Sequence, residues 1–135
     1  MKTDKMNRAL LLTRVVFGFL IVYLHGIPKL MGGRERWQRL GSSLSGSLGI
    51  DGVNVFFGFM AMMAETLGGI LILVGLYTRI SASFLAFTIL VAFSGHLVRD
   101  GFAGSEKPLL FLVYFISLVL SGAGSFSIDK IWRKK

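Results

Sequence analysis

Four long apolar stretches constrain this chain more than any other feature of its sequence. An α-helix needs about 20 mostly apolar residues to cross the hydrocarbon core of a bilayer, because it rises about 1.5 Å per residue. The stretches cover residues 9–31, 53–76, 80–98 and 108–123. With 53% hydrophobic and 16% charged residues, the chain is too apolar for an ordinary soluble domain. The sequence therefore predicts an all-α membrane protein, a four-transmembrane-helix bundle that forms one domain over residues 1–135.

The connections between these stretches are very unequal in length. Only residues 77–79 join the second stretch to the third, so these two helices must form a tight antiparallel hairpin. The connection of residues 32–52 is long, and apolar residues recur in it at helical spacing, opposite Arg and Ser side chains. These apolar residues are Trp37, Leu40, Leu44 and Leu48. The pattern predicts a short interfacial amphipathic helix between the first and second spans, and we favour a membrane-resting connector over a gating lid.

Positive charge at the ends of the stretches predicts how the bundle is oriented, because loops rich in Lys and Arg stay in the cytoplasm. The termini and the 77–79 hairpin together carry eight Lys or Arg against two Asp, whereas the other two loops carry six against four Asp or Glu. Both termini are therefore predicted to be cytoplasmic. The net charge of +8 belongs to these membrane flanks, so the expected partner is membrane lipid and not nucleic acid.

Glu65 lies at the middle of the second stretch, where burying an acid in lipid costs roughly 2.5–3.5 kcal/mol. It must therefore face the bundle interior and pair with a cation, or stay protonated and hydrogen-bonded to backbone or to Thr66. On an ideal helix, the first stretch places Arg14, His25 and Lys29 along one stripe. Arg14 is the expected partner, because Lys29 lies too far toward the outer face. The alternative for Arg14 is to extend its side chain to the cytoplasmic headgroups.

Two histidines are predicted to lie at matching depth near the outer face, His25 on the first stretch and His96 at the end of the third. Paired histidines are the minimal pattern for ligating a haem, but the chain has only these two, so neither a haem nor a metal is expected. We expect the two to form a polar outer pocket with Lys29 and Glu106. The chain has no Cys, which excludes thiol–disulfide chemistry.

Five short motifs occur in a fixed order along nearly the whole chain. They cover residues 14–19, 25–30, 65–69, 75–79 and 122–129. Together they resemble the DoxX family. The resemblance implies a four-helix protein of a bacterial or archaeal cytoplasmic (inner) membrane, related to the membrane subunit of thiosulfate:quinone oxidoreductase. It also implies that five side chains occupy recurring polar positions of the family and form the candidate intramembrane site: Arg14, His25, Lys29, Glu65 and Arg79.

Functions of different classes remain open on these residues. The first, which the resemblance supports, is an accessory subunit of a membrane oxidoreductase that binds a quinone or similar redox partner in a polar intramembrane pocket. Its partners would be a soluble or peripheral oxidoreductase and further copies of itself. The second is a small-solute or ion permease with Glu65, Arg14 and His25 along its path. The third is a structural or stress-response membrane protein without catalytic activity. Because the sequence shows no nucleotide, flavin or metal motif, we do not expect a complete enzyme, and no catalytic residue is assigned.

Overall fold

The computed structural model describes residues 2–50 and 52–132, and every regular element in this part of the chain is helical. The elements follow one another as α1 (Lys2–Ile21), η1 (Val22–Gly26), α2 (Ile27–Leu48), α3 (Asn54–Met63), η2 (Ala64–Gly68), α4 (Gly69–Val74), α5 (Thr78–Gly104), α6 (Glu106–Ser121) and α7 (Ile128–Trp132). Here η marks a π-helical turn, in which each hydrogen bond spans one residue more than in an α-helix.

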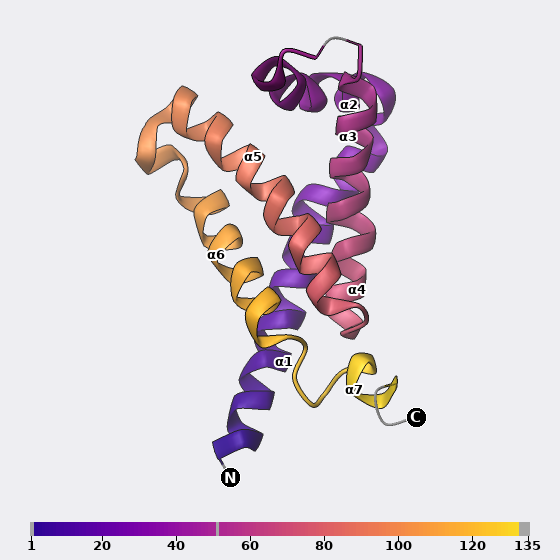
Figure 1. The fold of residues 1–135 in the computed structure, drawn as a ribbon, viewed down its shortest axis with the longest axis vertical. Coiled ribbons are helices and arrows are strands. Elements are labelled where there is room, and N and C mark those ends of the chain that lie inside the picture. Colours follow the sequence, from indigo (N-terminus) through magenta and orange to yellow (C-terminus); the bar gives the residue numbers. More distant parts are fainter. Residues whose placement is uncertain (1, 51, 133–135) are drawn as a thin grey trace.

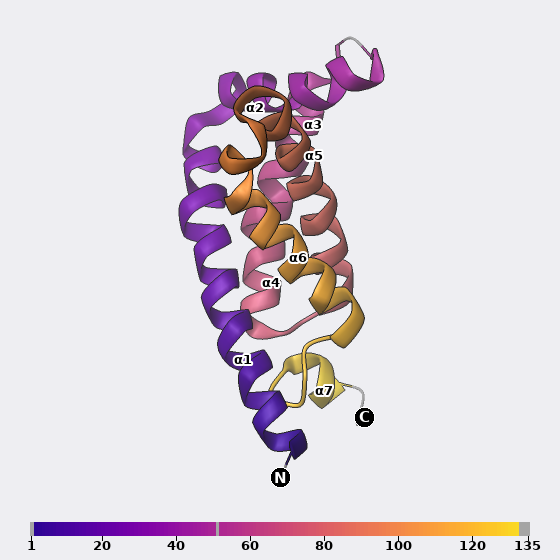
Figure 2. The ribbon, with the colours of Figure 1, turned by 90° about the vertical axis from the view of Figure 1, so that its left-hand side faces the viewer.

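The helices form an elongated bundle of four rods (Figure 1). The first rod is α1, η1 and the start of α2, the second is α3, η2 and α4, and α5 and α6 are the third and fourth. The two chain ends lie at the same end of the bundle, which we call the terminal end (Figures 1 and 2). The opposite end, where α2 turns into α3, is the loop end.

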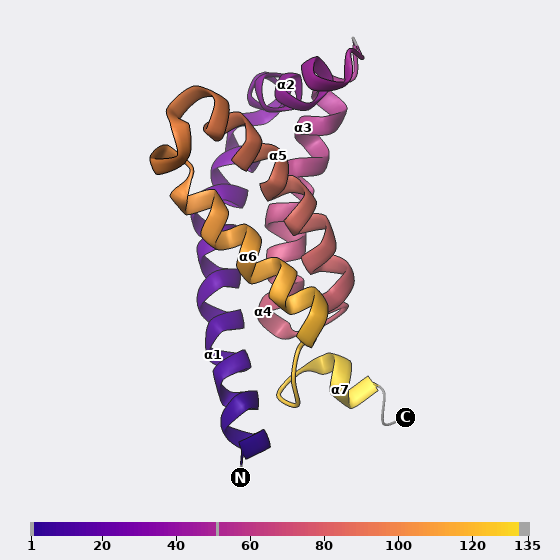
Figure 3. The ribbon, with the colours of Figure 1, turned by 60° about the vertical axis from the view of Figure 1, so that its left-hand side comes forward.

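Three helices in the described part of the chain are long and apolar enough to cross a membrane: Thr3–Gly46, Asn54–Val74 and Thr78–Gly104. The protein is therefore an all-helical membrane protein with several candidate spans. The predicted fourth span corresponds to α6, which has 16 residues and returns beside α5 toward the terminal end (Figure 3). At about 1.5 Å per residue it measures about 24 Å, somewhat less than the roughly 30 Å of a hydrocarbon core. Its crossing of the bilayer stays a prediction.

The predicted helix within residues 32–52 is present as the part of α2 that follows Gly33. Gly33 (φ 59°, ψ −158°) kinks α2, and the chain beyond it lies across the loop end against α3 (Figure 2). The backbones of α2 and α3 are in contact there. A Cβ added at Gly58 would lie 1.8 Å from the carbonyl oxygen of Trp37, and one at Gly41 would lie 1.7 Å from that of Asn54. Such close contact favours the connector interpretation over the gating lid.

The core of the bundle is apolar and tightly packed. Its fully or nearly fully buried side chains are Ile21, Ile72, Ala82, Leu85, Ile89, Leu112, Phe115 and Leu118. Glycines allow the first two rods to approach closely, as is common between membrane helices. A Cβ on Gly69, for example, would lie 2.5 Å from Cγ2 of Val22. The lipid-facing surface is also apolar, with Leu12, Val98 and Leu120 all more than 60% exposed.

The tight hairpin between the second and third rods is confirmed. Gly75 (φ 72°) ends α4 in the left-handed region, and Tyr77 (φ 48°) precedes α5 in the same region. The two rods then run side by side and contact each other along η2 and α4. This arrangement fixes the position of Glu65, which lies within η2.

Candidate functional site

A buried ion pair joins the first two rods inside the bundle. The Lys29 ammonium lies 2.5 Å from the Glu65 carboxylate (Nζ to Oε2), and the two side chains are 12% and 1% exposed. Burial at this depth is costly for a lone charge, so the two groups compensate each other. Glu65 thus faces the bundle interior, as predicted.

The expected partner of Glu65 was wrong: Lys29, and not Arg14, makes the pair. Arg14 lies 15 residues earlier on the same rod, about 22 Å along the helix axis, which is too far for one carboxylate to serve both cations. In addition, η1 lies between the two positions. A π turn adds one residue to the helical repeat and rotates all later side chains relative to an ideal helix, which breaks the stripe that the sequence suggested.

The two π turns face each other at this pair. η1 and η2 are in contact, and a Cβ added at Gly26 would lie 2.8 Å from the hydroxyl oxygen of Thr66. The absence of a side chain at Gly26 therefore allows the two turns to touch. The ion pair lies close to this contact, because Lys29 follows Gly26 by about one helical turn and Glu65 directly precedes Thr66. π turns inside α-helices are often found at functional sites. The coincidence of both turns with the one buried ion pair among the described residues marks this level of the bundle as the candidate site.

Arg14 has a structural environment at the terminal end. Its guanidinium donates to the carbonyl oxygens of Ala123 (2.5 Å) and Phe126 (2.6 Å), and the residue is only 2% exposed. The side chain therefore does not extend to headgroups either. It holds the segment of residues 121–127, which follows α6, against the first rod.

Asp129 and Asn7 complete this clamp, and sequence reasoning missed both. The Asp129 carboxylate accepts the backbone N–H groups of Tyr77 (2.7 Å) and Thr78 (2.9 Å), which are free at the start of α5. Asn7 Oδ1 accepts the N–H of Ser125 (3.0 Å). One signal in the sequence pointed to Asp129. Tyr77, which precedes α5, has no side-chain oxygen suited to capping a helix, so the first N–H groups of α5 need an acceptor from elsewhere in the chain.

The remaining predicted site residues are spread over both ends of the bundle. His25 is half-buried, and its ring lies edge-on to Phe111 of α6 with the centroids 5.7 Å apart. His96 pairs with Asp100 (Nδ1 to Oδ2, 2.8 Å), its neighbour one helical turn away, which the sequence analysis had overlooked. Glu106 is exposed at the start of α6, and Arg79 is exposed at the terminal end.

These contacts do not assemble the predicted outer pocket. Within residues 2–50 and 52–132, no hydrogen bond or ion pair joins His96 or Glu106 to His25 or Lys29. In the same part of the chain, no three His, Asp or Glu side chains lie close enough together to hold a metal ion.

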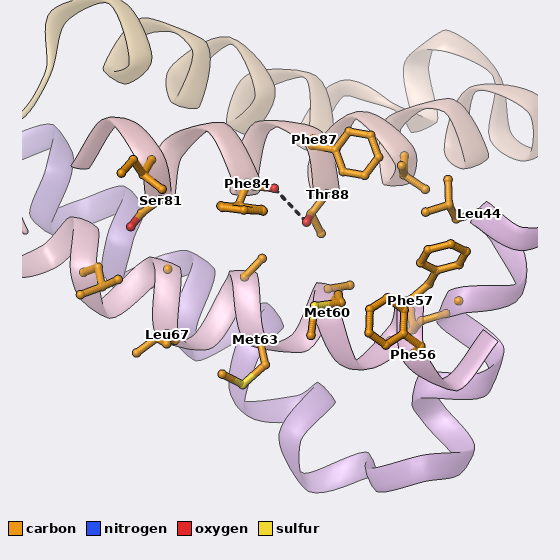
Figure 4. Close-up of a pocket in the computed structure, with 18 of the residues that line it drawn as sticks. Leu44, Phe56, Phe57, Met60, Met63, Leu67, Ser81, Phe84, Phe87 and Thr88 are labelled. Carbon is orange, nitrogen blue, oxygen red and sulfur yellow. Dashed lines mark hydrogen bonds between the residues drawn. The ribbon is translucent and has the colours of Figure 1, made fainter. Parts of the chain in front are cut away.

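A second feature of this level is a long apolar groove between the second rod and α5. It has a volume of about 640 Å³ and is lined at the loop end by residues of α2. Met60, Met63 and Leu67 line it from the second rod, and Phe84 and Phe87 line it from α5 (Figure 4). Ala64, Leu67 and Gly68 of η2 line the groove, whereas Glu65 of the same turn points to Lys29 on another face.

Comparison with known proteins shows what kind of chain this is. Residues 9–97 match the sequence profile of the DoxX family. The chain belongs to the DoxX family. It is 31% identical over 120 residues to a Bacillus subtilis protein named "Putative oxidoreductase CatD", a match that covers 88% of this chain and 83% of the relative. It is 36% identical over 91 residues to "Inner membrane protein YqjF" of Escherichia coli, with 62% and 68% coverage.

The chain is also 30% identical over 129 residues to a Haemophilus influenzae protein described as an uncharacterised protein, a match that covers 90% of this chain and 89% of the relative. No solved structure matches the chain. The matched residues 9–97 include Arg14 and the Lys29–Glu65 pair, while the clamp residue Asp129 follows them in sequence. The family profile therefore covers the whole π-turn site and both walls of the apolar groove.

Proposed function

We propose that this DoxX-family chain is an accessory subunit of a membrane oxidoreductase and that it binds a quinone or similar redox carrier within the bilayer. The observation that carries the proposal is the apolar groove of about 640 Å³, which lies beside the π turn that holds Glu65. Ligand pockets of about 300–1,000 Å³ with mostly apolar walls hold small molecules and cofactors. The aromatic and Met side chains of this groove suit a quinone ring and its isoprenoid tail.

The proposal places the ligand in the groove and not in a polar pocket, as the sequence alone had suggested. Reduction of a quinone to a quinol consumes two electrons and two protons. Under this proposal, electrons come from a soluble or peripheral oxidoreductase. Proton exchange is a suitable role for Glu65, which shares η2 with the groove-lining Ala64, and for its ion-pair partner Lys29. The relative named "Putative oxidoreductase CatD" agrees with this class of function.

The proposal includes the membrane topology. α6 crosses the bilayer as the fourth span, both termini face the cytoplasm, and the membrane is a bacterial inner membrane, as the name of the Escherichia coli relative suggests. A permease is less well supported by the packing. The core of the bundle includes the fully buried apolar side chains of Ile21, Ile72 and Phe115, which would have to move apart before a polar solute could pass.

Quinone content tests the proposal directly. The protein is purified from quinone-containing membranes in nanodiscs, and bound quinone is extracted and quantified. Leu67→Trp enlarges a groove-lining side chain and should remove most of the quinone. Leu110→Trp is the matched control, because Leu110 is 58% exposed on α6 and is absent from the groove. Quinone at only the level of the surrounding lipid, in wild type and both variants, would contradict the proposal and favour a structural or stress-response protein.

A further inference from the structure

A small polar cavity lies at the terminal end, separate from the groove and the ion pair. It has a volume of about 230 Å³ and lies between the start of α5, the segment of residues 121–127 and the start of α7. Asn7 of α1 forms part of its wall. Because pockets for whole small molecules usually measure about 300–1,000 Å³, this cavity is suited to a smaller group, such as one end of a lipid.

The cavity carries positive charge that the fold leaves available. Arg79 and Lys130 line it together with one acid, Asp129. The carboxylate of Asp129 already accepts two backbone N–H groups at the start of α5, at 2.7 and 2.9 Å. Within residues 2–50 and 52–132, Arg79 makes one hydrogen bond, from Nη2 to the carbonyl oxygen of Leu120 (3.2 Å), and no residue of this part of the chain occupies its other donors. Among the described residues, the Lys130 ammonium has no hydrogen bond or ion pair.

Aromatic side chains indicate the depth of the cavity relative to the membrane. Tyr77, whose backbone N–H donates to the cavity-lining Asp129, and Trp132 of α7 form an edge-to-face ring pair with centroids 6.0 Å apart. Both side chains are exposed, at 52% and 57%. Exposed Tyr and Trp gather at the level of the lipid headgroups, because their rings are apolar and their N–H or O–H groups are polar. Arg79 and Lys130 are close to these two residues in sequence, which puts the cavity at the level of lipid phosphates.

We propose that this cavity binds the phosphate group of an anionic phospholipid headgroup. Arg79 donates to the phosphate oxygens through the fork geometry of its guanidinium, and Lys130 adds a second positive charge. Asn7 accepts a backbone bond with Oδ1, which leaves its amide nitrogen as a neutral donor. Basic pockets between helices at a membrane surface are suited to such headgroups. This inference does not depend on quinone binding, because it concerns a different ligand and a cavity that shares no lining residue with the groove.

A competing explanation is that Arg79 only compensates the carbonyl groups at the end of α6, through its bond to Leu120. Under that explanation Arg79→Gln lowers thermal stability without changing lipid preference. Lys130 has no such bond, so Lys130→Gln separates the two explanations and keeps the test valid if Arg79→Gln fails to fold.

The experiment uses the full chain in nanodiscs of equal parts phosphatidylglycerol and phosphatidylcholine. After transfer to detergent, lipids that remain bound are counted by native mass spectrometry, and a thermal melt shows that each variant is folded. We expect wild type to retain phosphatidylglycerol preferentially. Arg79→Gln and Lys130→Gln should each reduce this retention about five-fold, the equivalent of about 1 kcal/mol per basic residue at a lipid surface. Lys107→Gln, an exposed Lys at the loop end, is the control and should change nothing.

A second arm identifies the source of the phosphate. Excess inorganic phosphate should not displace bound phosphatidylglycerol if a lipid is the ligand. Displacement that depends on Arg79 and Lys130 would support a phosphate site but assign it to a soluble phosphate compound. Equal retention of both lipids by wild type, with no effect of phosphate, would overturn the proposal. So would a preference for phosphatidylglycerol that Lys107→Gln reduces as much as Lys130→Gln.

Discussion

At the level of single residues, the most important contact is the ion pair between Glu65 and Lys29. Sequence reasoning placed an acid inside the bundle correctly, because an unpaired carboxylate cannot face lipid. It chose Arg14 because an ideal helix was assumed, and no periodic signal in an all-apolar stretch reveals a π turn such as Val22–Gly26. The resulting division is simple. Arg14 binds carbonyl oxygens at the terminal end, while Lys29 pairs with Glu65 near the loop end.

Removal of one partner of the pair tests this assignment. Glu65→Gln leaves the Lys29 ammonium, which is 12% exposed, without its counter-charge. Breaking a buried pair in this way typically costs about 3–5 kcal/mol, and we expect a loss at the lower end because Lys29 can reach toward water at the loop end. Glu65→Gln with Lys29→Met should recover a large part of that loss. Unfolding of the four proteins in detergent gives the coupling energy.

Glu106→Gln is the matched control for this cycle, because Glu106 is exposed and makes no ion pair among the described residues. It should leave stability nearly unchanged. Strictly additive effects of Glu65→Gln and Lys29→Met would show that the two side chains do not interact.

At the element scale, the sequence predicted helices better than their junctions. The hairpin at residues 77–79 and a helix within residues 32–52 were both expected, and both are present. What the pattern did not show is that the first rod and this helix are separated by a single non-helical residue, Gly33. Hydrophobic spacing is nearly the same on either side of such a kink, so only the backbone conformation of one glycine distinguishes a bent helix from two separate ones.

Two glycines of the loop end provide a matched test of how α2 packs on α3. Gly58→Ala places a methyl group 1.8 Å from the carbonyl oxygen of Trp37, so the two helices must separate. We expect a loss of about 2–4 kcal/mol in unfolding free energy, as for other overpacked contacts with rigid backbone. Gly46→Ala on α2 meets nothing within 4 Å and should be neutral or stabilise by up to about 1 kcal/mol through helix propensity. Equal effects of the two would mean that α2 does not rest on α3.

At the scale of the whole molecule, composition was enough to predict a membrane protein, and three candidate spans agree with it. The groove could not be predicted, because Met60, Leu67 and Phe84 look like any other lipid-facing residues until two rods are placed side by side. The clamp was also hidden, since it joins Asn7 and Asp129 to distant backbone groups.

The four-span topology has a direct test, since the chain has no native Cys. Lys5→Cys lies at the terminal end and Ser43→Cys at the loop end, and both positions are exposed. In intact cells, a membrane-impermeant maleimide should label Ser43→Cys, while Lys5→Cys and an added Cys at Lys134, outside the described residues, should react only after the cells are opened. Labelling of positions 43 and 5 from the same side of the membrane would contradict this topology, because the structure places them at opposite ends of the bundle.

Photo-crosslinking can show whether a redox carrier occupies the groove that is lined in part by η2, the π turn of Glu65. The protein is irradiated in nanodiscs with an isoprenoid quinone that carries a photoreactive tail, and the modified peptides are sequenced. The account predicts crosslinks concentrated at Met63, Leu67 and Phe84, reduced by excess unlabelled quinone and lost in Leu67→Trp. Crosslinks spread evenly over lipid-facing residues such as Val113, with no competition by quinone, would contradict it.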